Sequence, residues 1–316
     1  MVKSEGNKRM AMETWPKVAI IVLNWNGWRD TIKCLESLQQ ITYPNYQIVV
    51  VDNGSTDDSV ERLKAAYPDL SLIVTHKNLG YAGGNNIGIR YALEQGADYV
   101  LILNNDTIVE PNVLTVMVDV AKKTGASVVG ALIKDMSTKK LLFAKSNYPA
   151  MLFYSEPQKR VPNERYWFSD RVEGSAMLLA RDLLLKRERT CGYFLDDSLF
   201  LYCEEIELAL WCRQNNKKSV IAGEAIVYHK VGSSSGGRAR PIQFYYLTRN
   251  RVLLARRYLH GPLKVCFFAF YPIWKITRAG LYVAKGQFGI AKAILQGLLD
   301  GFKGKAGAKD DRATSA

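Results

Sequence analysis

The first hundred residues alternate short apolar runs with segments of helical periodicity. Four runs have the length and the β-branched composition of buried strands: 18–24, 47–52, 71–75 and 99–103. Helical spacing or helix-starting acidic residues fill the intervals between them, at 30–40, 57–67 and 84–95. Because the strands are apolar on both faces, this alternation predicts a mostly parallel sheet that helices cover on both faces. The expected fold class is therefore α/β, of the Rossmann-like kind.

Polar side chains follow three of these strands at the point where each strand ends. They are Asn24 after the first strand, Asp52 and Asn53 after the second, and Asn104, Asn105 and Asp106 after the fourth. In open parallel sheets, ligands bind at the carboxyl ends of the strands. An ordinary turn would explain one such cluster, but three at one sheet edge favour a binding site. Asp52 could there accept hydrogen bonds from a ribose or a base edge.

Residues 78–89, NLGYAGGNNIGI, are rich in glycine, with Gly80, Gly83, Gly84 and Gly88 within nine positions. Glycine lets the backbone approach a ligand closely. The helix expected from residue 84 offers unpaired N–H groups and a positive dipole end, which suit a phosphate group. The segment matches neither a Walker loop nor a strict GxGxxG pattern, so a flexible loop is the alternative.

Asp106 is a candidate ligand for a hard divalent cation, Mg²⁺ or Mn²⁺. Such cations prefer carboxylate oxygens and also bind phosphates, and Asn104 is a neutral helper nearby. His229, one of three histidines, ends another expected strand region, 219–228. Paired with Asp106 it would complete a metal site that suits Mn²⁺ as well as Mg²⁺. The alternatives are a helix N-cap for Asp106 and a structural role for the histidine.

Acidic residues cluster in FLYCEEIELALWCRQ, residues 200–214, which begins an expected amphipathic helix at 203–215. Glu204, Glu205 and Glu207 stand there among apolar and aromatic side chains. A carboxylate that is partly buried in such surroundings has a raised pKa and can remove a proton from a hydroxyl group. Favourable charge at a helix N-terminus explains one or two of these acids, but not the clustering beside aromatic residues.

Seven motifs occur in order along the chain: VLNWNG (22–27), VVVDNGSTDDS (49–59), NLGYAGGNNIGI (78–89), LNNDT (103–107), VEGSAMLLAR (172–181), FLYCEEIEL (200–208) and YHKVGSSSG (228–236). Together they make the region from Val18 to Gly237 resemble family 2 of the inverting glycosyltransferases, which have the GT-A fold. The subgroup that the chain resembles most is the bacterial rhamnosyltransferases of cell-surface polysaccharide assembly.

The resemblance implies roles for four residues. Asp52 matches the nucleotide-binding aspartate of the family, and Asp106 matches the metal-binding residue of its Asp-x-Asp motif. Glu205 matches the general base, and His229 matches a histidine that completes the metal site in some relatives. Two departures matter: Asn104 replaces the first aspartate of Asp-x-Asp, and a glutamate stands at the base position. The choice of base therefore lies between Glu205 and Glu204.

The resemblance also implies an activity: metal-dependent, inverting transfer of a sugar from a nucleotide-diphosphate donor to a glycan acceptor. The acceptor would be linked to a polyprenyl diphosphate, and the reaction would belong to O-antigen or cell-wall assembly. Rhamnose from dTDP-rhamnose is favoured, and galactose, GlcNAc or galactofuranose from a UDP donor is the alternative. Donor-binding residues are expected at Asn24, Asn26, Asp52, Asn53, Asn78, Gly80, Gly84, Asn85, Asn104, Asn105 and Asp106. Acceptor-binding residues are expected at Glu173, Gly174, Trp211 and Arg249.

The C-terminal region is strongly basic. From Arg238 to Ala316 there are fifteen Lys or Arg and only three Asp or Glu, which accounts for nearly all of the net charge of +13. Between residues 277 and 302, apolar residues keep a three-four spacing that basic residues flank. This pattern favours amphipathic helices that lie on an anionic membrane surface. A helix packed on the catalytic domain, or a dimer contact, is the alternative.

These features divide the chain into four parts: a polar tail at 1–15, a GT-A domain at 16–237, a basic amphipathic helical region at 238–302 and a disordered tail at 303–316. Five scattered cysteines without a CxxC pair, and no apolar core in the first fourteen residues, predict a cytoplasmic protein, peripheral on the inner face of the cell membrane.

Two other classes of protein remain as rivals. A sugar nucleotidyltransferase would carry a glycine-rich, basic phosphate loop after the first strand, where this chain has NWNGWRD. A nucleic-acid-binding protein is suggested by the pI of about 9.4. The charge, however, lies beside an apolar stripe, so no nucleic-acid partner is expected.

Overall fold

The computed structural model describes residues 15–146, 161–230 and 240–309. Its strands are β1 (Val18–Asn24), β2 (Tyr46–Asp52), β3 (Ser71–Val74), β4 (Tyr99–Asn104), β5 (Thr107–Val109), β6 (Val128–Asp135), β7 (Leu141–Phe143), β8 (Tyr166–Phe168), β9 (Ala176–Ala180) and β10 (Ser219–His229). Its α-helices are α1 (Trp28–Leu38), α2 (Ser59–Ala66), α3 (Gly80–Glu94), α4 (Val113–Thr124), α5 (Arg181–Cys191), α6 (Glu204–Gln214), α7 (Pro241–Tyr258), α8 (Gly261–Ala284) and α9 (Phe288–Phe302), and a 3₁₀ turn, η1, spans Asp197–Leu199.

The strands form one mixed sheet in the order β3-β2-β1-β4-β9-β6-β10-β5, with β7 beside β6 and β8 beside β10. The first four are parallel, and β6 is parallel to β10. Strand β9 runs antiparallel between β4 and β6. The start of β9 therefore lies beside the end of β4, where the backbone N–H of Asn104 donates to the carbonyl of Ser175. The predicted α/β class is confirmed, and so is the helix-covered sheet, whose core strands are fully buried.

The glycine-rich segment is helical, which corrects the expectation of a phosphate loop before a helix at residue 84. Helix α3 begins at Gly80. A Cβ at Gly84 would lie 2.5 Å from Leu23 Cδ1, and one at Gly88 would lie 2.5 Å from Ile21 Cγ2. These glycines let α3 pack directly on β1, so their first role is close contact between helix and sheet.

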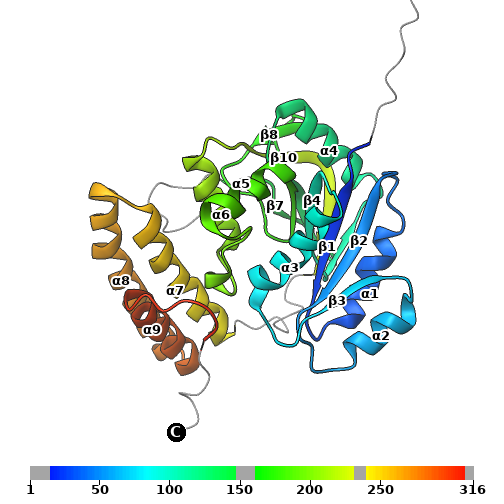
Figure 1. The fold of residues 1–316 in the computed structure, drawn as a ribbon. Helices are drawn as coiled ribbons and strands as arrows, with labels where there is room; N and C mark the ends of the chain where they lie inside the picture. The colour runs from blue at the N-terminus through cyan, green and yellow to red at the C-terminus, as the bar shows by residue number, and fades with distance from the viewer. Residues whose placement is uncertain (1–14, 147–160, 231–239, 310–316) are drawn as a thin grey trace, which may run out of the picture.

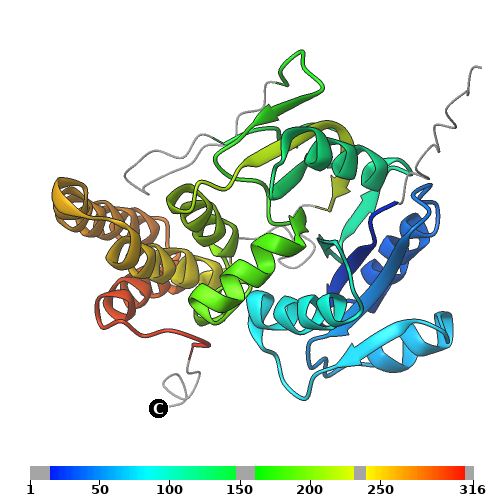
Figure 2. The same cartoon turned by 45° about the horizontal axis from the view of Figure 1, so that its top comes forward.

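The C-terminal helices gather at one side of the molecule, beside α6 and opposite β3 (Figures 1 and 2). Their presence confirms the predicted helical region. Pro272 lies inside α8, although proline in a helix interior removes a backbone hydrogen bond. The stripe expected from 277 to 302 is divided between α8 and α9 at Gly286, whose φ of +70° suits glycine. Helix α9 approaches α7 closely, because a Cβ at Gly297 would lie 2.5 Å from the carbonyl oxygen of Tyr245.

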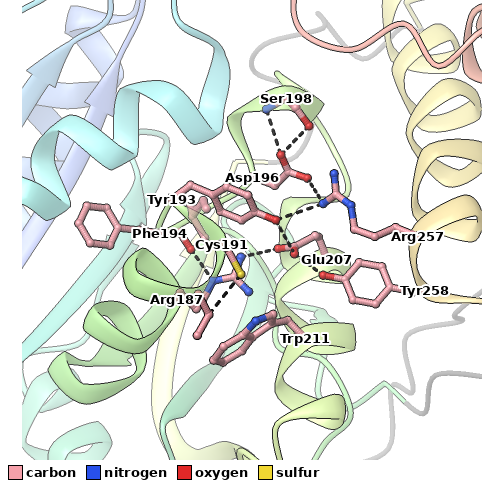
Figure 3. A network of polar contacts seen from close by, with 12 residues as sticks. Arg187, Cys191, Tyr193, Phe194, Asp196, Ser198, Glu207, Trp211, Arg257 and Tyr258 are labelled. Carbon is pink, nitrogen blue, oxygen red and sulfur yellow. Dashed lines mark hydrogen bonds and ion pairs between the residues drawn. The ribbon is translucent and has the colours of Figure 1, made fainter.

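A buried polar network joins α5, α6 and α7 (Figure 3). Arg187 and Glu207 form an ion pair whose side chains are both fully buried. The Glu207 carboxylate also accepts hydrogen bonds from the hydroxyls of Tyr193 and Tyr258. Arg257 of α7 pairs in turn with the buried carboxylate of Asp196. Polar contacts therefore fix the position of α6 between the sheet domain and the C-terminal helices.

The Arg187–Glu207 pair is expected to be critical for stability. Replacing Arg187 with Met leaves a buried carboxylate without its cation, which typically costs about 3–5 kcal/mol of unfolding free energy. Urea unfolding measures the loss. Arg90→Met is the matched control, because Arg90 also pairs with a glutamate, Glu188, but has a side chain that is 54% exposed. That control should cost less than about 1 kcal/mol, and equal losses in the two variants would contradict the prediction.

Candidate functional site

The ends of β1 and β2 are joined by buried hydrogen bonds. The Asn24 amide donates to Asp52 Oδ2 at 2.7 Å, and Ser55 donates to the same carboxylate through its backbone N–H and its hydroxyl. Asp52 has no exposed surface. The Asp52 carboxylate thus accepts three hydrogen bonds within the protein and holds the ends of β1 and β2 together. Its contact with a ribose or base stays a prediction.

A second polar group lies where β2 meets the start of α3. The Asn53 amide donates to Asn78 Oδ1 at 3.1 Å and to the carbonyl of Gly80 at 3.0 Å. Both Asn53 and Asn85 are buried, whereas Asn78 is partly exposed. Gly84 packs against Asn53, since a Cβ there would lie 3.1 Å from Asn53 Oδ1. The buried members of this group therefore hold the carboxyl end of β2 against α3, whereas Asn78 has surface that a ligand can reach.

Other expected donor-binding residues have surface available to a ligand. Asn26 is exposed, with a positive φ of 51°, and its side chain accepts from the backbone N–H of Thr56. Asn104 and Asn105 at the tip of β4 are partly exposed. The Asn105 amide donates to Thr31 Oγ1 at 2.9 Å. The residues that follow β1 and β4 thus line the sheet edge, as the alternating sequence predicts.

Asp106 and His229 lie together, 3.1 Å apart between Oδ1 and Nε2. The antiparallel pairing of β10 with β5, in which His229 faces Thr107, brings them to the same place. Burial by itself lowers the pKa of His229, but the hydrogen bond and the charge of Asp106 outweigh it, so the pKa is raised. A carboxylate and an imidazole are suitable donors for Mn²⁺ or Mg²⁺. Within the described parts of the chain no group of three His, Cys, Asp or Glu could hold a metal ion, so water or a bound phosphate would supply the other ligands.

Arg171 connects two acidic residues that come from different elements. Its Nη1 lies 3.1 Å from Glu205 Oε1 at the start of α6, and 3.3 Å from Glu173 Oε2 before β9. The arginine is buried over the ring of Phe143. Desolvation and the Glu205 charge raise the pKa of Glu173, against the opposite effects of Arg171 and His229. Our sequence reasoning missed Arg171, although its position two residues before Glu173 is a signal.

Glu204 and Glu205 have different surroundings, although they are neighbours in the chain. Burial raises the pKa of Glu204 to about 8, with the Glu205 charge as a further cause. A carboxyl with that pKa is mostly protonated at neutral pH, and with 3% of its surface exposed Glu204 is poorly accessible to an acceptor hydroxyl. Glu205 is more exposed, at 19% of its side chain, and is paired with Arg171. These surroundings favour Glu205 as a proton acceptor.

Tyr81 of α3 lies between the two halves of the site. Its hydroxyl donates to the carbonyl of Gly174 at 2.6 Å. Burial first, and then the charges of four surrounding carboxylates, raise its pKa well above the ordinary value; these are Glu204, Glu205, Glu173 and Asp106. The Tyr81 hydroxyl is therefore close enough to Asp106 and to Glu205 for the charge of each to affect its pKa. Sequence reasoning also missed this tyrosine.

Two expected acceptor-binding residues are not available to an acceptor, which is a correction. Trp211 is 5% exposed and packs over the Arg187 guanidinium (Figure 3). Arg249 is 1% exposed, and its guanidinium donates to Asn250 Oδ1 and to two backbone carbonyls. Glu173 and Gly174, by contrast, are partly exposed beside Glu205.

Comparison with known proteins gives consistent results. The model of the family "Glycosyl transferase family 2" matches residues 19–184. The chain is similar to the low-salt glycan biosynthesis hexosyltransferase Agl10 of Haloferax volcanii, with 25% identity over 92% of each chain. It is also similar to the dTDP-rhamnosyl transferase RfbF of Shigella flexneri, with 23% identity over 91% of this chain and 96% of that one. Among solved structures, GalNAc-T7 with UDP, GalNAc and Mn²⁺ superposes with a TM-score of 0.65 at 17% identity, covering 82% of this chain and 51% of that chain.

Proposed function

The chain belongs to glycosyl transferase family 2, and from that premise we propose that it transfers rhamnose, with inversion, from dTDP-rhamnose to a lipid-linked glycan. A glycosyltransferase activity is shown by the family. The similarity to a dTDP-rhamnosyl transferase over nearly the whole chain supports the sugar. Two sets of contacts support the mechanism: the Asp106–His229 pair, and the ion pairs of Arg171 with Glu205 and Glu173. The charges of Asp106 and Glu205 both act on the Tyr81 hydroxyl, which supports a shared site.

Glu205 acts as the general base in this proposal. Arg171 holds its Oε1 at 3.1 Å, which leaves Oε2 to accept the proton of the acceptor hydroxyl. Gly174 has no side chain, and even an added Cβ would stay 4.0 Å from that oxygen, so the carboxylate has an open side. The acceptor oxygen then attacks the anomeric carbon from the face opposite the nucleotide, and the configuration inverts.

Asp106 and His229 would hold a divalent cation, which when bound neutralises charge on the leaving diphosphate. Asn104, at the tip of β4, contributes no charge, so the diphosphate itself supplies part of the coordination. The polar residues that follow β1 and β4 bind the donor at the sheet edge. Asn26, Asn104 and Asn105 are the members of this set with exposed surface, and Asn78, which precedes α3, is also partly exposed.

The test is a screen of nucleotide sugars for donor hydrolysis and for transfer. The purified protein is incubated with dTDP-rhamnose, UDP-galactose, UDP-GlcNAc and UDP-galactofuranose, with Mn²⁺ and with a chelator. We expect turnover of dTDP-rhamnose that the chelator abolishes. Turnover of a UDP sugar alone would replace the sugar, and metal-independent turnover would remove the proposed role of Asp106 and His229.

We also propose that α8 lies on an anionic membrane surface at the inner face of the cell membrane, which would suit a polyprenyl-linked acceptor. Apolar side chains are exposed along one face of this helix: Val265 (70%), Phe270 (64%), Ile273 (63%), Ile276 (55%), Leu281 (58%) and Val283 (47%). Residues 238–316, which include this helix, carry almost the whole net positive charge of the protein. None of the described helices is long and apolar enough to cross a membrane.

Vesicle binding should therefore depend on both charge and this apolar face. We expect co-sedimentation with vesicles containing 30% phosphatidylglycerol, lower binding to pure phosphatidylcholine, and roughly tenfold weaker binding of the double variant Phe270→Ser and Ile273→Ser. A tenfold change corresponds to about 1.4 kcal/mol, which is less than the roughly 1.5–3 kcal/mol that full burial of one such side chain provides and suits shallow insertion of both. Val74→Ser, an exposed apolar change on β3, is the control. A variant that binds normally but changes oligomeric state would instead identify a contact between copies of the chain.

A further inference from the structure

The segment that leads into α6 has an unusual backbone. Phe200, Tyr202 and Cys203 all have positive φ, between 65° and 77°, although none is glycine. Non-glycine residues occupy this region rarely, and they do so where surrounding contacts hold them. Glu204 and Glu205 follow directly as the first residues of α6. The direction in which α6 begins therefore depends on what fixes residues 199–203.

Two buried side chains of α7 bind the carbonyl groups of this segment. Asn250 Nδ2 lies 3.0 Å from the carbonyl oxygen of Leu199, 2.9 Å from that of Leu201 and 2.7 Å from that of Tyr202. Arg249 Nη2 donates to the Leu199 carbonyl at 2.8 Å, and its Nε donates to Asn250 Oδ1 at 2.9 Å. Asn250 is fully buried, and Arg249 is 1% exposed. The arginine thus orients the amide that contacts three carbonyl groups.

The two other carbonyls of the segment are bound by elements other than α7: that of Cys203 accepts the backbone N–H of Glu207 within α6, and that of Phe200 is bound by α3. The backbone N–H of Tyr81, at the start of α3, donates to the Phe200 carbonyl at 2.7 Å. The chain approaches so closely there that a Cβ at Gly80 would lie 2.2 Å from the Phe200 oxygen. Residues 199–203 are therefore held by hydrogen bonds to two helices. One is α3, which begins beside the expected donor-binding residues, and the other is α7 of the C-terminal helical region.

We propose that Asn250, oriented by Arg249, is a positioning residue for Glu205, so that α7 takes part in setting the geometry of the reaction. This inference rests on the function proposed above. Asn250 touches no reacting atom. It acts through the backbone of Leu201 and Tyr202, which lie four and three residues before Glu205. Loss of its amide frees the left-handed residues to relax, and the Glu205 carboxylate moves relative to the sugar.

The experiment compares Asn250→Ala with Tyr245→Phe. Tyr245 is a matched control, because it is a buried residue of the same helix whose hydroxyl donates to Asp300 of α9 at 3.0 Å and not to residues 199–203. For Asn250→Ala we expect kcat of transfer to fall on the order of a hundredfold, as a displacement near 1 Å can cause. Titration with the nucleotide sugar should give a donor Kd within about twofold of the wild type. Tyr245→Phe should keep kcat within about threefold.

Hydrogen exchange gives a readout that does not depend on activity. Peptides covering residues 199–206 should exchange faster in Asn250→Ala than in Tyr245→Phe at matched distance below each melting temperature. Unchanged exchange there, or a parallel change of kcat and donor Kd, would overturn the inference. If Asn250→Ala does not fold, Asn250→Ser, which keeps a short donor, takes its place under the same criteria. An inactive wild type would count against the proposed function, whereas an active wild type with a fully active Asn250 variant counts only against this inference.

Discussion

Glu205→Gln is expected to lower the rate of glycosyl transfer by a factor of about 10²–10⁴, the usual contribution of a positioned general base. The amide retains the size of the side chain and can still contact Arg171 through its oxygen, but it cannot take the acceptor proton. Donor binding should persist, because the donor-binding residues follow β1 and β4. Single-turnover transfer with saturating donor and acceptor measures the chemical step.

Glu204→Gln is the matched control for this prediction. The neighbouring carboxyl has a pKa of about 8, so it is already mostly uncharged at pH 7 and an amide imitates it closely. That variant should therefore retain most of its transfer activity at pH 7. If Glu204→Gln were inactive and Glu205→Gln active, the roles of the two residues would be exchanged.

Asp106→Ala is expected to reduce transfer by about three orders of magnitude in Mn²⁺ or Mg²⁺. Removing the carboxylate leaves His229 as the one remaining protein ligand of the pair, and several kcal/mol of charge neutralisation on the diphosphate is lost; about 4 kcal/mol corresponds to a thousandfold. Rates measured against the concentration of free Mn²⁺ should show a much weaker dependence than in the wild type.

Asp135→Asn serves as the control for charge alone. Asp135 ends β6 opposite His229, but its carboxylate accepts hydrogen bonds from Ser137 and Thr138 in its own turn. Its removal should leave transfer and metal dependence within a few-fold of the wild type. A large and equal loss in both variants would mean that overall negative charge, and not coordination by Asp106, supports the reaction.

Much of the fold could be predicted because its signals are local. The apolar runs of β1, β2 and β4 carry their own periodicity, and the polar residues that end them mark the edge of the sheet. The pairing of Asp106 with His229 was also anticipated, through the resemblance to the family, and the two residues lie in contact. The antiparallel direction of strand β9, in contrast, depends on its pairing with β4 and β6, which are distant in the sequence.

The remaining features depend on tertiary contacts that local patterns do not encode. The glycines of α3 suggested a loop, yet contact with Leu23 and Ile21 favours a glycine-bearing helix. The hydrogen bond from Asn24 to Asp52 joins residues 28 positions apart, so no local pattern reveals it. Arg249 was expected to bind the acceptor. Its guanidinium instead donates to the carbonyl of Leu199, 50 positions earlier in the chain, and this contact exists only in the folded structure.

The contacts from α7 bear on where the catalytic unit ends. The sequence suggests a boundary near residue 238, yet side chains beyond it satisfy the buried carboxylates of Glu207 and Asp196. A shortened chain that stopped at residue 237 would lose the contacts of Tyr258 and Arg257 with these carboxylates, and the Asn250 amide that binds three carbonyls ahead of α6. We therefore expect the start of α6 to take its native conformation only in a chain that includes α7.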